Sequence, residues 1–400
     1  MRLSSLLFVL LALVFSAEAA QPSPQQLQNW LKRFPDADAD GDGRLSAAEA
    51  RAFQKKMRGD QRPKRGDNGG RGAPRTFKVD PGWEKERFPE HAVAYKSPDE
   101  ILEIYTAQVG GKKALVSFDK PADGALRIVG TGHSFMAPGY KTFPLIARAA
   151  GMDQPLYTHT GGGITGSARY KWEQENGIFQ FEGKPVPKLL ASIANADWEA
   201  MMWGPYFNDR PEYYACWIEF CLKHNPDMKF FLSDAWPQLY QLGEIPKSED
   251  FFTEEVMVRL GRERTAGYRE LVDGLNEKYG NRIFIMPTSD AMVLAARRFI
   301  REGLPGVEGL HKAVGGKNRS LWRDPLGHLG PGFDRLEGYV FYATIYGRSP
   351  ELIKNEIQFR DEGGFPGDEL DAIFRGIAWQ AVVNNPLSGV RDKDGDGVRD

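Results

Sequence analysis

Short apolar segments alternate with segments of helical spacing from Leu126 to Glu302, and this alternation constrains the fold more than any other feature. Apolar runs of this length, bounded by turn residues, are typical of buried strands. We expect strands at 126–130, 154–159, 197–203, 228–234 and 282–286, and helices at 142–150, 186–195, 209–224, 252–279 and 289–302. The order predicts an α/β domain with a mainly parallel five-stranded sheet that helices cover on both faces.

The first predicted strand ends at Gly130-Thr-Gly-His-Ser-Phe135, and functional sites of parallel sheets lie at such carboxyl ends. Glycine lets the backbone turn sharply there, so that the hydroxyl of Ser134 is held at the rim of the sheet. A nucleophile is usually presented on a turn of this kind. A serine that merely caps the following helix fits the same residues equally well.

Three further segments bear on this choice. Gly161-Gly-Gly163 follows the second predicted strand, and Gly204-Pro-Tyr-Phe-Asn208 follows the third. The segment Arg323-Asp-Pro-Leu-Gly-His328-Leu-Gly-Pro-Gly lies late in the chain. These blocks, in this order, resemble those of the SGNH (GDSL-like) hydrolase superfamily, and the resemblance covers about residues 125–350.

The resemblance implies a three-layer α/β/α, flavodoxin-like domain in which Ser134 is the nucleophile, His328 the base and Asp324 the residue that orients the base. It also implies that the Gly162 N–H and the Asn208 side chain stabilise the oxyanion together with the Ser134 N–H. Losing one such donor typically costs about 3 kcal/mol. Residues 336–350 correspond to the closing helix of these enzymes.

The sequence departs from the family pattern in three places. His133 replaces the aspartate that usually precedes the serine, and we expect it to shape the turn. Asn208 lies four residues past Gly204, where two is usual, and Asp324 and His328 are four apart, where three is common. Asn208 therefore also fits a helix cap, and the glycines fit a plain turn. If Asp324 points elsewhere, His328 works with a carbonyl partner, or His311 is the base.

A second motif, at 38–49, matches the EF-hand calcium loop at every defining position. Gly43 makes the tight turn, and Leu45 occupies the apolar position that tethers the loop. The predicted calcium ligands are Asp38, Asp40, Asp42, Arg44 (through its carbonyl), Ser46 and Glu49. The alternative is an acidic, solvated loop.

The aspartate ladder recurs at Asp392, Asp394 and Asp396, with Gly397 at the turn. The printed sequence has no glutamate at the twelfth position, so this segment resembles the acidic calcium repeats of secreted bacterial proteins more than an EF-hand. Weaker calcium binding and a disordered acidic tail are both consistent with it.

The first residues fit a secretory signal, with Arg2, an apolar core and Ala17-Glu-Ala19 as a cleavage site. No other segment is apolar enough to predict stable membrane insertion. The expected parts are a signal peptide (1–19), an EF-hand segment (20–57), a basic flexible linker (58–75), an SGNH-hydrolase-like domain (76–385) and an acidic tail (386–400). Cys216 and Cys221, five apart in a predicted helix, are expected to be free thiols.

These features predict a secreted or periplasmic serine esterase that cleaves acyl or acetyl esters, with carbohydrate-linked esters among the candidates. Calcium would bind the EF-hand without taking part in the ester chemistry. The alternative is a non-catalytic, calcium-dependent binding protein with an SGNH-like fold. A net charge of −2 gives no bias toward nucleic acid, and the sequence does not define the oligomeric state.

Trp172, Trp203 and Trp236 lie near strand ends, where they either stack on a sugar ring or belong to the core.

Overall fold

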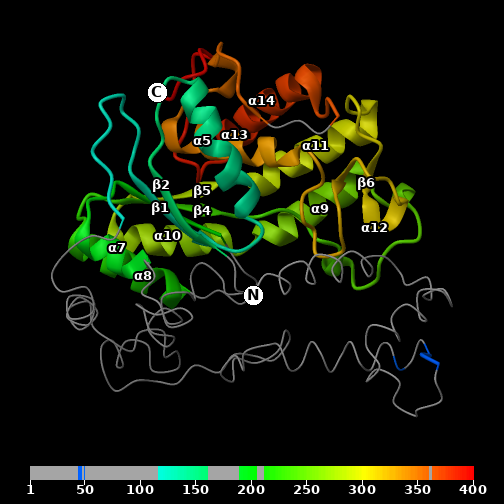
Figure 1. Ribbon diagram of the computed structural model, residues 1–400, viewed down its shortest axis with the longest axis horizontal. Helices are drawn as coiled ribbons and strands as arrows, with labels where there is room; N and C mark the ends of the chain where they lie inside the picture. Colours follow the sequence, from blue (N-terminus) through cyan, green and yellow to red (C-terminus); the bar gives the residue numbers. More distant parts are fainter. Residues whose placement is uncertain (1–43, 47–48, 50–115, 161–188, 205–210, 360–362) are drawn as a thin grey trace. The chain divides into compact units, whose positions relative to one another are not determined.

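A five-stranded parallel sheet is the centre of the computed structural model, which describes residues 44–46, 49, 116–160, 189–204, 211–359 and 363–400 (Figure 1). The strand order is β2-β1-β3-β4-β5. The strands are β1 (Ile128–Gly132), β2 (Leu156–Thr160), β3 (Ala200–Trp203), β4 (Lys229–Ser233) and β5 (Ile283–Met286). The chain divides into two units, Met1–Thr76 and Phe77–Asp400, and the sheet belongs to the second. The predicted strands are therefore confirmed, within a few residues at each end.

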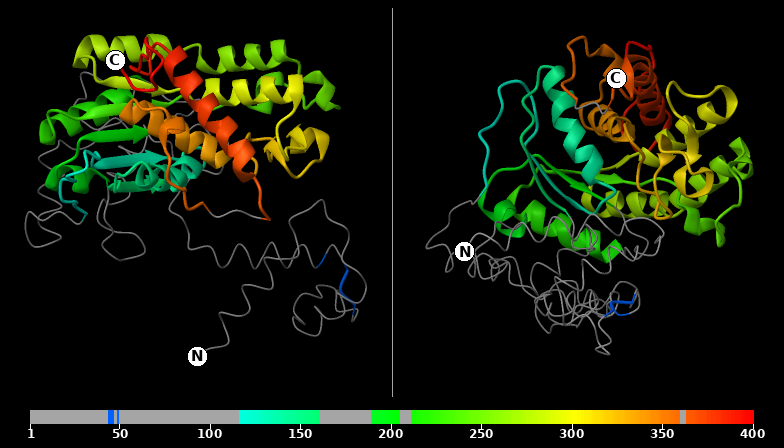
Figure 2. Two further views of the ribbon diagram at one scale, coloured as in Figure 1. Left: turned by 90° about the horizontal axis from the view of Figure 1, so that it is seen from above. Right: turned by 45° about the vertical axis from the view of Figure 1, so that its right-hand side comes forward.

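Helices cover both faces of this sheet, which confirms the predicted three-layer α/β/α architecture (Figure 1). One face carries α5 (Ala137–Ala149), α11 (Thr288–Glu302), α13 (Phe333–Tyr346) and α14 (Gly367–Asn384). The other face carries α7 (Leu189–Asn195), α8 (Pro211–His224) and α10 (Tyr268–Tyr279). Figure 2 shows α13 and α14 side by side over the same face.

The strand side chains alternate between two hydrophobic clusters, as expected for strands that are buried on both faces. Ile128, Met202 and Phe231 belong to the first cluster. Their neighbours Val129 and Met201, and Phe230 with Leu232, belong to the second. The period of two along each strand thus builds two cores, one on each face of the sheet.

Two predicted helix boundaries were wrong. The helix expected at 252–279 is two helices, α9 (Glu254–Thr265) and α10, with Gly267 as the residue that precedes α10. Glycine alone does not place the break, since Gly261 lies inside α9 and Gly274 inside α10. The helix expected to begin at 142 begins at Ala137, because a proline in the first turn needs no hydrogen-bond acceptor for its nitrogen.

A small second sheet, which was not predicted, is formed by the part of the chain between α11 and α13. It pairs β6 (Gly309–His311) with β7 (Ser320–Trp322) in parallel, and α12 (Lys312–Gly315) connects them. Strands of three residues are too short for a period of two to be recognised. The predicted closing helix at 336–350 is α13, which ends at Tyr346 because Gly347 turns the chain with a φ of +61°. In the described part of the chain, no helix is long and apolar enough to cross a membrane.

Candidate active site

Ser134 lies in the turn that joins β1 to α5, at the carboxyl edge of the sheet, and is exposed. Gly132, the last residue of β1, has a φ of +152°, a conformation that favours glycine. A Cβ atom at Gly132 would lie 2.7 Å from Cγ of Met136, so a larger residue would force the Met136 side chain to move. The Met136 N–H donates to the His133 carbonyl at 3.0 Å and closes the turn.

Asp324 and His328 lie in the loop that follows β7. The loop folds back on itself, since the Arg323 N–H donates to the His328 carbonyl at 2.9 Å. The Gly327 N–H donates to the Asp324 carbonyl at 2.8 Å, and Gly327 has a φ of +83°. This tight turn brings the side chains of Asp324 and His328 to the same side of the loop.

The three side chains form a continuous hydrogen-bonded chain. His328 Nε2 lies 2.7 Å from Ser134 Oγ, although the two residues are 194 positions apart. On the other side of the ring, His328 Nδ1 lies 2.8 Å from Asp324 Oδ2 and 3.0 Å from Oδ1. Because a carboxylate only accepts, Nδ1 carries the proton and Nε2 is left to accept from the serine hydroxyl.

Asp324 is held by more than the histidine ring. Its Oδ1 accepts the N–H groups of Leu326 at 3.1 Å and His328 at 3.2 Å, so the carboxylate also closes its own turn. The unusual four-residue spacing does not misdirect Asp324, because the backbone at 324–328 curls around its side chain.

His311, the alternative base, is placed differently. It is 4% exposed, and its Nδ1 accepts the Ala313 N–H at 3.2 Å at the start of α12. Burial lowers the pKa of His311 to about 4, while the charge of Asp324 acts in the opposite direction. His311 is therefore a buried, neutral cap of α12, and the partner of Ser134 is His328.

The predicted oxyanion residues Gly162 and Asn208 lie outside the described residues, so their roles stay predictions. The Ser134 N–H has no hydrogen-bond acceptor in the part of the chain that the structure describes. His133 Nδ1 accepts the Phe135 N–H at 3.3 Å, so this histidine helps to shape the turn, as predicted.

Two of the three candidate sugar-stacking tryptophans are core residues instead. Trp203 and Trp236 are fully buried, at 0% exposure, and Trp203 stacks on Phe230 with ring centroids 5.1 Å apart. Neither face can stack on a ligand, so that interpretation was wrong for both; Trp172 lies outside the described residues. Cys216 and Cys221 are buried and form no disulfide with each other, as predicted.

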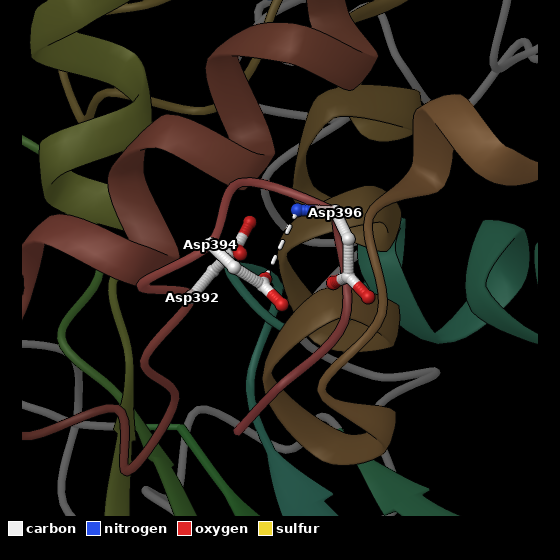
Figure 3. A group of neighbouring side chains, drawn as sticks. All are labelled: Asp392, Asp394 and Asp396. Carbon is white, nitrogen blue, oxygen red and sulfur yellow. Dashed lines mark hydrogen bonds between the residues drawn. The ribbon is translucent and has the colours of Figure 1, made fainter.

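The C-terminal aspartates lie on one folded loop (Figure 3). One carboxylate oxygen of each of Asp392, Asp394 and Asp396 lies within 4.8 Å of the others, a spacing that oxygen ligands of one calcium ion can have. The Trp379 indole donates to Asp392 at 3.1 Å, and Val398 pairs with Arg348. The alternative of a disordered tail does not describe this segment. The arrangement fits calcium, and calcium binding stays a prediction, since exposed acidic groups are common without an ion.

Little of the EF-hand motif is described. Leu45 is buried, and Ser46 and Glu49 are joined by reciprocal hydrogen bonds of the capping-box type. Ser46 donates from its N–H and hydroxyl to Glu49 Oε2 at 2.9 and 2.7 Å, and the Glu49 N–H donates to Ser46 Oγ at 3.1 Å. Arg44 is described as well, whereas the predicted ligands Asp38, Asp40 and Asp42 lie outside the described residues, so the EF-hand also stays a prediction.

Among the solved structures to which the chain is similar are two that are distant in sequence. One is a DUF4886 family protein from Bacteroides uniformis, 11% identical, with a TM-score of 0.42; the match covers 65% of this chain and 95% of that one. The other is the periplasmic domain of a lipopolysaccharide acetyltransferase from Salmonella ser. Paratyphi A, 10% identical, with a TM-score of 0.31, covering 61% and 94%. No family model matches the sequence, and no curated protein matches it. Likenesses this distant carry no argument about activity.

Proposed function

We propose that this protein is a serine-dependent ester hydrolase of the SGNH (GDSL-like) type that acts on acyl or acetyl esters outside the cytoplasm. The hydrogen-bonded chain from Ser134 Oγ through His328 to Asp324 carries the proposal. In this proposal Ser134 is the nucleophile, His328 the base and Asp324 the carboxylate that orients the base. Of the three side chains, that of the nucleophile Ser134 is the exposed one.

The geometry supports a two-step mechanism. Ser134 Oγ attacks the ester carbonyl while His328 Nε2 takes the hydroxyl proton, and Asp324 stabilises the imidazolium that forms. The developing oxyanion accepts from the Ser134 N–H and, in this proposal, from Gly162 and Asn208. His328 then returns the proton to the leaving alcohol. Water, deprotonated by His328, attacks the acyl-serine, and the carboxylic acid leaves as the hydroxyl of Ser134 is restored.

Hydrolysis is tested with the full chain on p-nitrophenyl and alkyl esters of increasing acyl length and on acetylated oligosaccharides. We expect turnover that Ser134→Ala abolishes and that Ser248→Ala, a change at another exposed serine, leaves intact. Adding an alcohol acceptor shows whether the acyl group passes to water or to that acceptor. Turnover that survives Ser134→Ala would refute the proposal. Inactivity of the wild type across the whole panel would favour the non-catalytic, calcium-dependent binding protein.

Calcium binding is the second part of the proposal. The three C-terminal carboxylates support it, because they bring oxygen ligands to one point. Calorimetric titration of calcium into the full chain is expected to show two classes of site. Asp394→Asn should remove the weaker class and Asp38→Asn the tighter one, while esterase activity survives both. Titration curves that neither substitution alters would contradict the assignment.

A further inference from the structure

The turn that follows β4 is fixed more firmly than a connecting loop requires. Ala235 has a φ of +52° and is the only residue other than glycine with positive φ in the described part of the chain. Its N–H donates to Ser233 Oγ at 3.2 Å, and Asp234 Oδ1 accepts the Ser289 N–H at 2.8 Å. A left-handed alanine persists only where its surroundings hold it, and such residues cluster at functional sites.

This turn places the Trp236 side chain against the loop that contains Asp324 and His328. Trp236 is fully buried, and its indole N–H donates to the carbonyl of Gly327, the residue before His328. Gln238, two residues further along the same segment, also packs on this loop, since a Cβ atom at Gly327 would lie 3.0 Å from Cγ of Gln238. The peptide between Gly327 and His328 is therefore held at both of its polar groups. Trp236 donates to its carbonyl, and Asp324 accepts from its N–H.

A second contact joins Trp236 to the nucleophile's turn. The Phe135 ring lies 5.0 Å from the Trp236 ring and, edge to face, 5.0 Å from the His328 ring, measured between centroids. Phe135 follows Ser134 directly in the chain. One buried indole thus supports both turns whose side chains meet at the hydrogen bond between Ser134 and His328.

We propose that Trp236 is a positioning residue for the reaction, an inference that rests on the proposed function. Trp236 fixes the positions of the Gly327 carbonyl and the Phe135 ring. It thereby keeps His328 Nε2 within hydrogen-bond distance of Ser134 Oγ in the first step and of the leaving alcohol's oxygen in the next. It touches no substrate in this scheme. Its loss should therefore slow proton transfer and leave substrate binding nearly unchanged.

The test compares Trp236→Phe with Trp203→Phe in the full chain. Both indoles are fully buried, but the Trp203 N–H has no hydrogen-bond partner among the described residues. Trp203→Phe therefore makes the same change of ring without removing a hydrogen bond that the structure describes. Small misplacements of catalytic groups can cost about 100-fold in rate. For Trp236→Phe we expect kcat to fall about 10- to 100-fold with KM changed less than about threefold, and for Trp203→Phe we expect both to stay near wild type.

The dependence of turnover on the leaving group distinguishes a positioning role from a merely structural one. An alkyl alcohol needs the proton from His328, whereas p-nitrophenolate leaves without it, so Trp236→Phe should slow alkyl esters more than p-nitrophenyl esters. Partial unfolding would slow both equally. Replacing Trp236 by benzothienylalanine, which keeps the ring shape and removes only the N–H, should give the same pattern if Trp236→Phe folds poorly.

The outcomes separate the two proposals. Equal kinetics for Trp236→Phe and Trp203→Phe, or equal slowing of both ester types, would overturn the positioning role while Ser134→Ala still abolished turnover. If Ser134→Ala stayed active, the proposed function itself would fail. A selective loss of alkyl-ester turnover in both Trp236 variants would support the inference.

Discussion

The turns after β1 and β4 are both at the carboxyl edge of the same sheet, and they are built in opposite ways. The turn after β1 uses a glycine, Gly132, and leaves Ser134 exposed. The turn after β4 uses a left-handed alanine held by buried hydrogen bonds, and it buries Trp236 completely.

In the proposed function, the two turns have different tasks. A nucleophile has to meet a substrate, so its turn presents a small polar side chain to solvent. A support has to resist movement, so its turn places a large ring where packing and a hydrogen bond fix it. In this proposal the site consists of an exposed reactive group on one turn and a buried support on another, and the following changes test that division.

The largest effect is expected at the exposed turn and its base. Ser134→Ala and His328→Ala should each lower kcat on the order of 10⁴- to 10⁶-fold, because each removes an indispensable part of one proton-transfer unit. The double variant should be about as slow as either single variant, since the two residues act together. Steady-state kinetics on one ester would measure this. Losses that multiply in the double variant would contradict it.

Asp324→Asn should have the next largest effect. The amide oxygen can still accept the N–H groups of Leu326 and His328, so the turn should survive. The amide nitrogen, however, favours the wrong tautomer of His328, and we expect kcat to fall roughly 10²- to 10⁴-fold. Asp273→Asn, at an exposed carboxylate on α10, is the matched control. A kcat within a few-fold of wild type would mean that His328 needs no carboxylate.

His311 should matter for stability against pH and not for catalysis. Its pKa is about 4 in the folded chain against an ordinary 6.5, because burial disfavours the charged ring. As the pH falls from 6.5 to 4, the unfolded chain binds a proton that the folded chain does not, so about 3 kcal/mol of stability is lost. Urea unfolding should show that His311→Asn lacks this loss while kcat stays within about threefold of wild type. If the His311→Asn variant were folded but inactive, His311 would again be a candidate for the base.

The smallest effects concern the backbone of the two turns and should differ in size. Gly132→Ala forces a Cβ atom to within 2.7 Å of Met136 and should cost about 1–3 kcal/mol. Ala235→Gly relieves a left-handed alanine but frees the unfolded chain, so the free energy of unfolding should change by less than about 1 kcal/mol. Thermal unfolding of both variants measures the difference. Equal destabilisation would show that the turns are not built in opposite ways.

The sheet could be predicted because its strands are apolar runs separated by helices, as at Ile128 and Ile283. The strands β6 and β7 could not, since three residues carry no usable period. Ser134, Asp324 and His328 were found from the order of their blocks in the chain. Trp236 was singled out only as a tryptophan near a strand end, because its contact with Gly327, 91 positions away, leaves no local signal.

The central claim is that Ser134 is the group activated by His328, and covalent labelling tests it most directly. The full chain is treated with a fluorophosphonate, digested, and the modified peptide located by mass spectrometry. We expect one stoichiometric adduct on Ser134, no adduct in Ser134→Ala, and labelling at least about 100-fold slower in His328→Ala. An adduct on another residue, or labelling of wild type and His328→Ala at the same rate, would contradict the account.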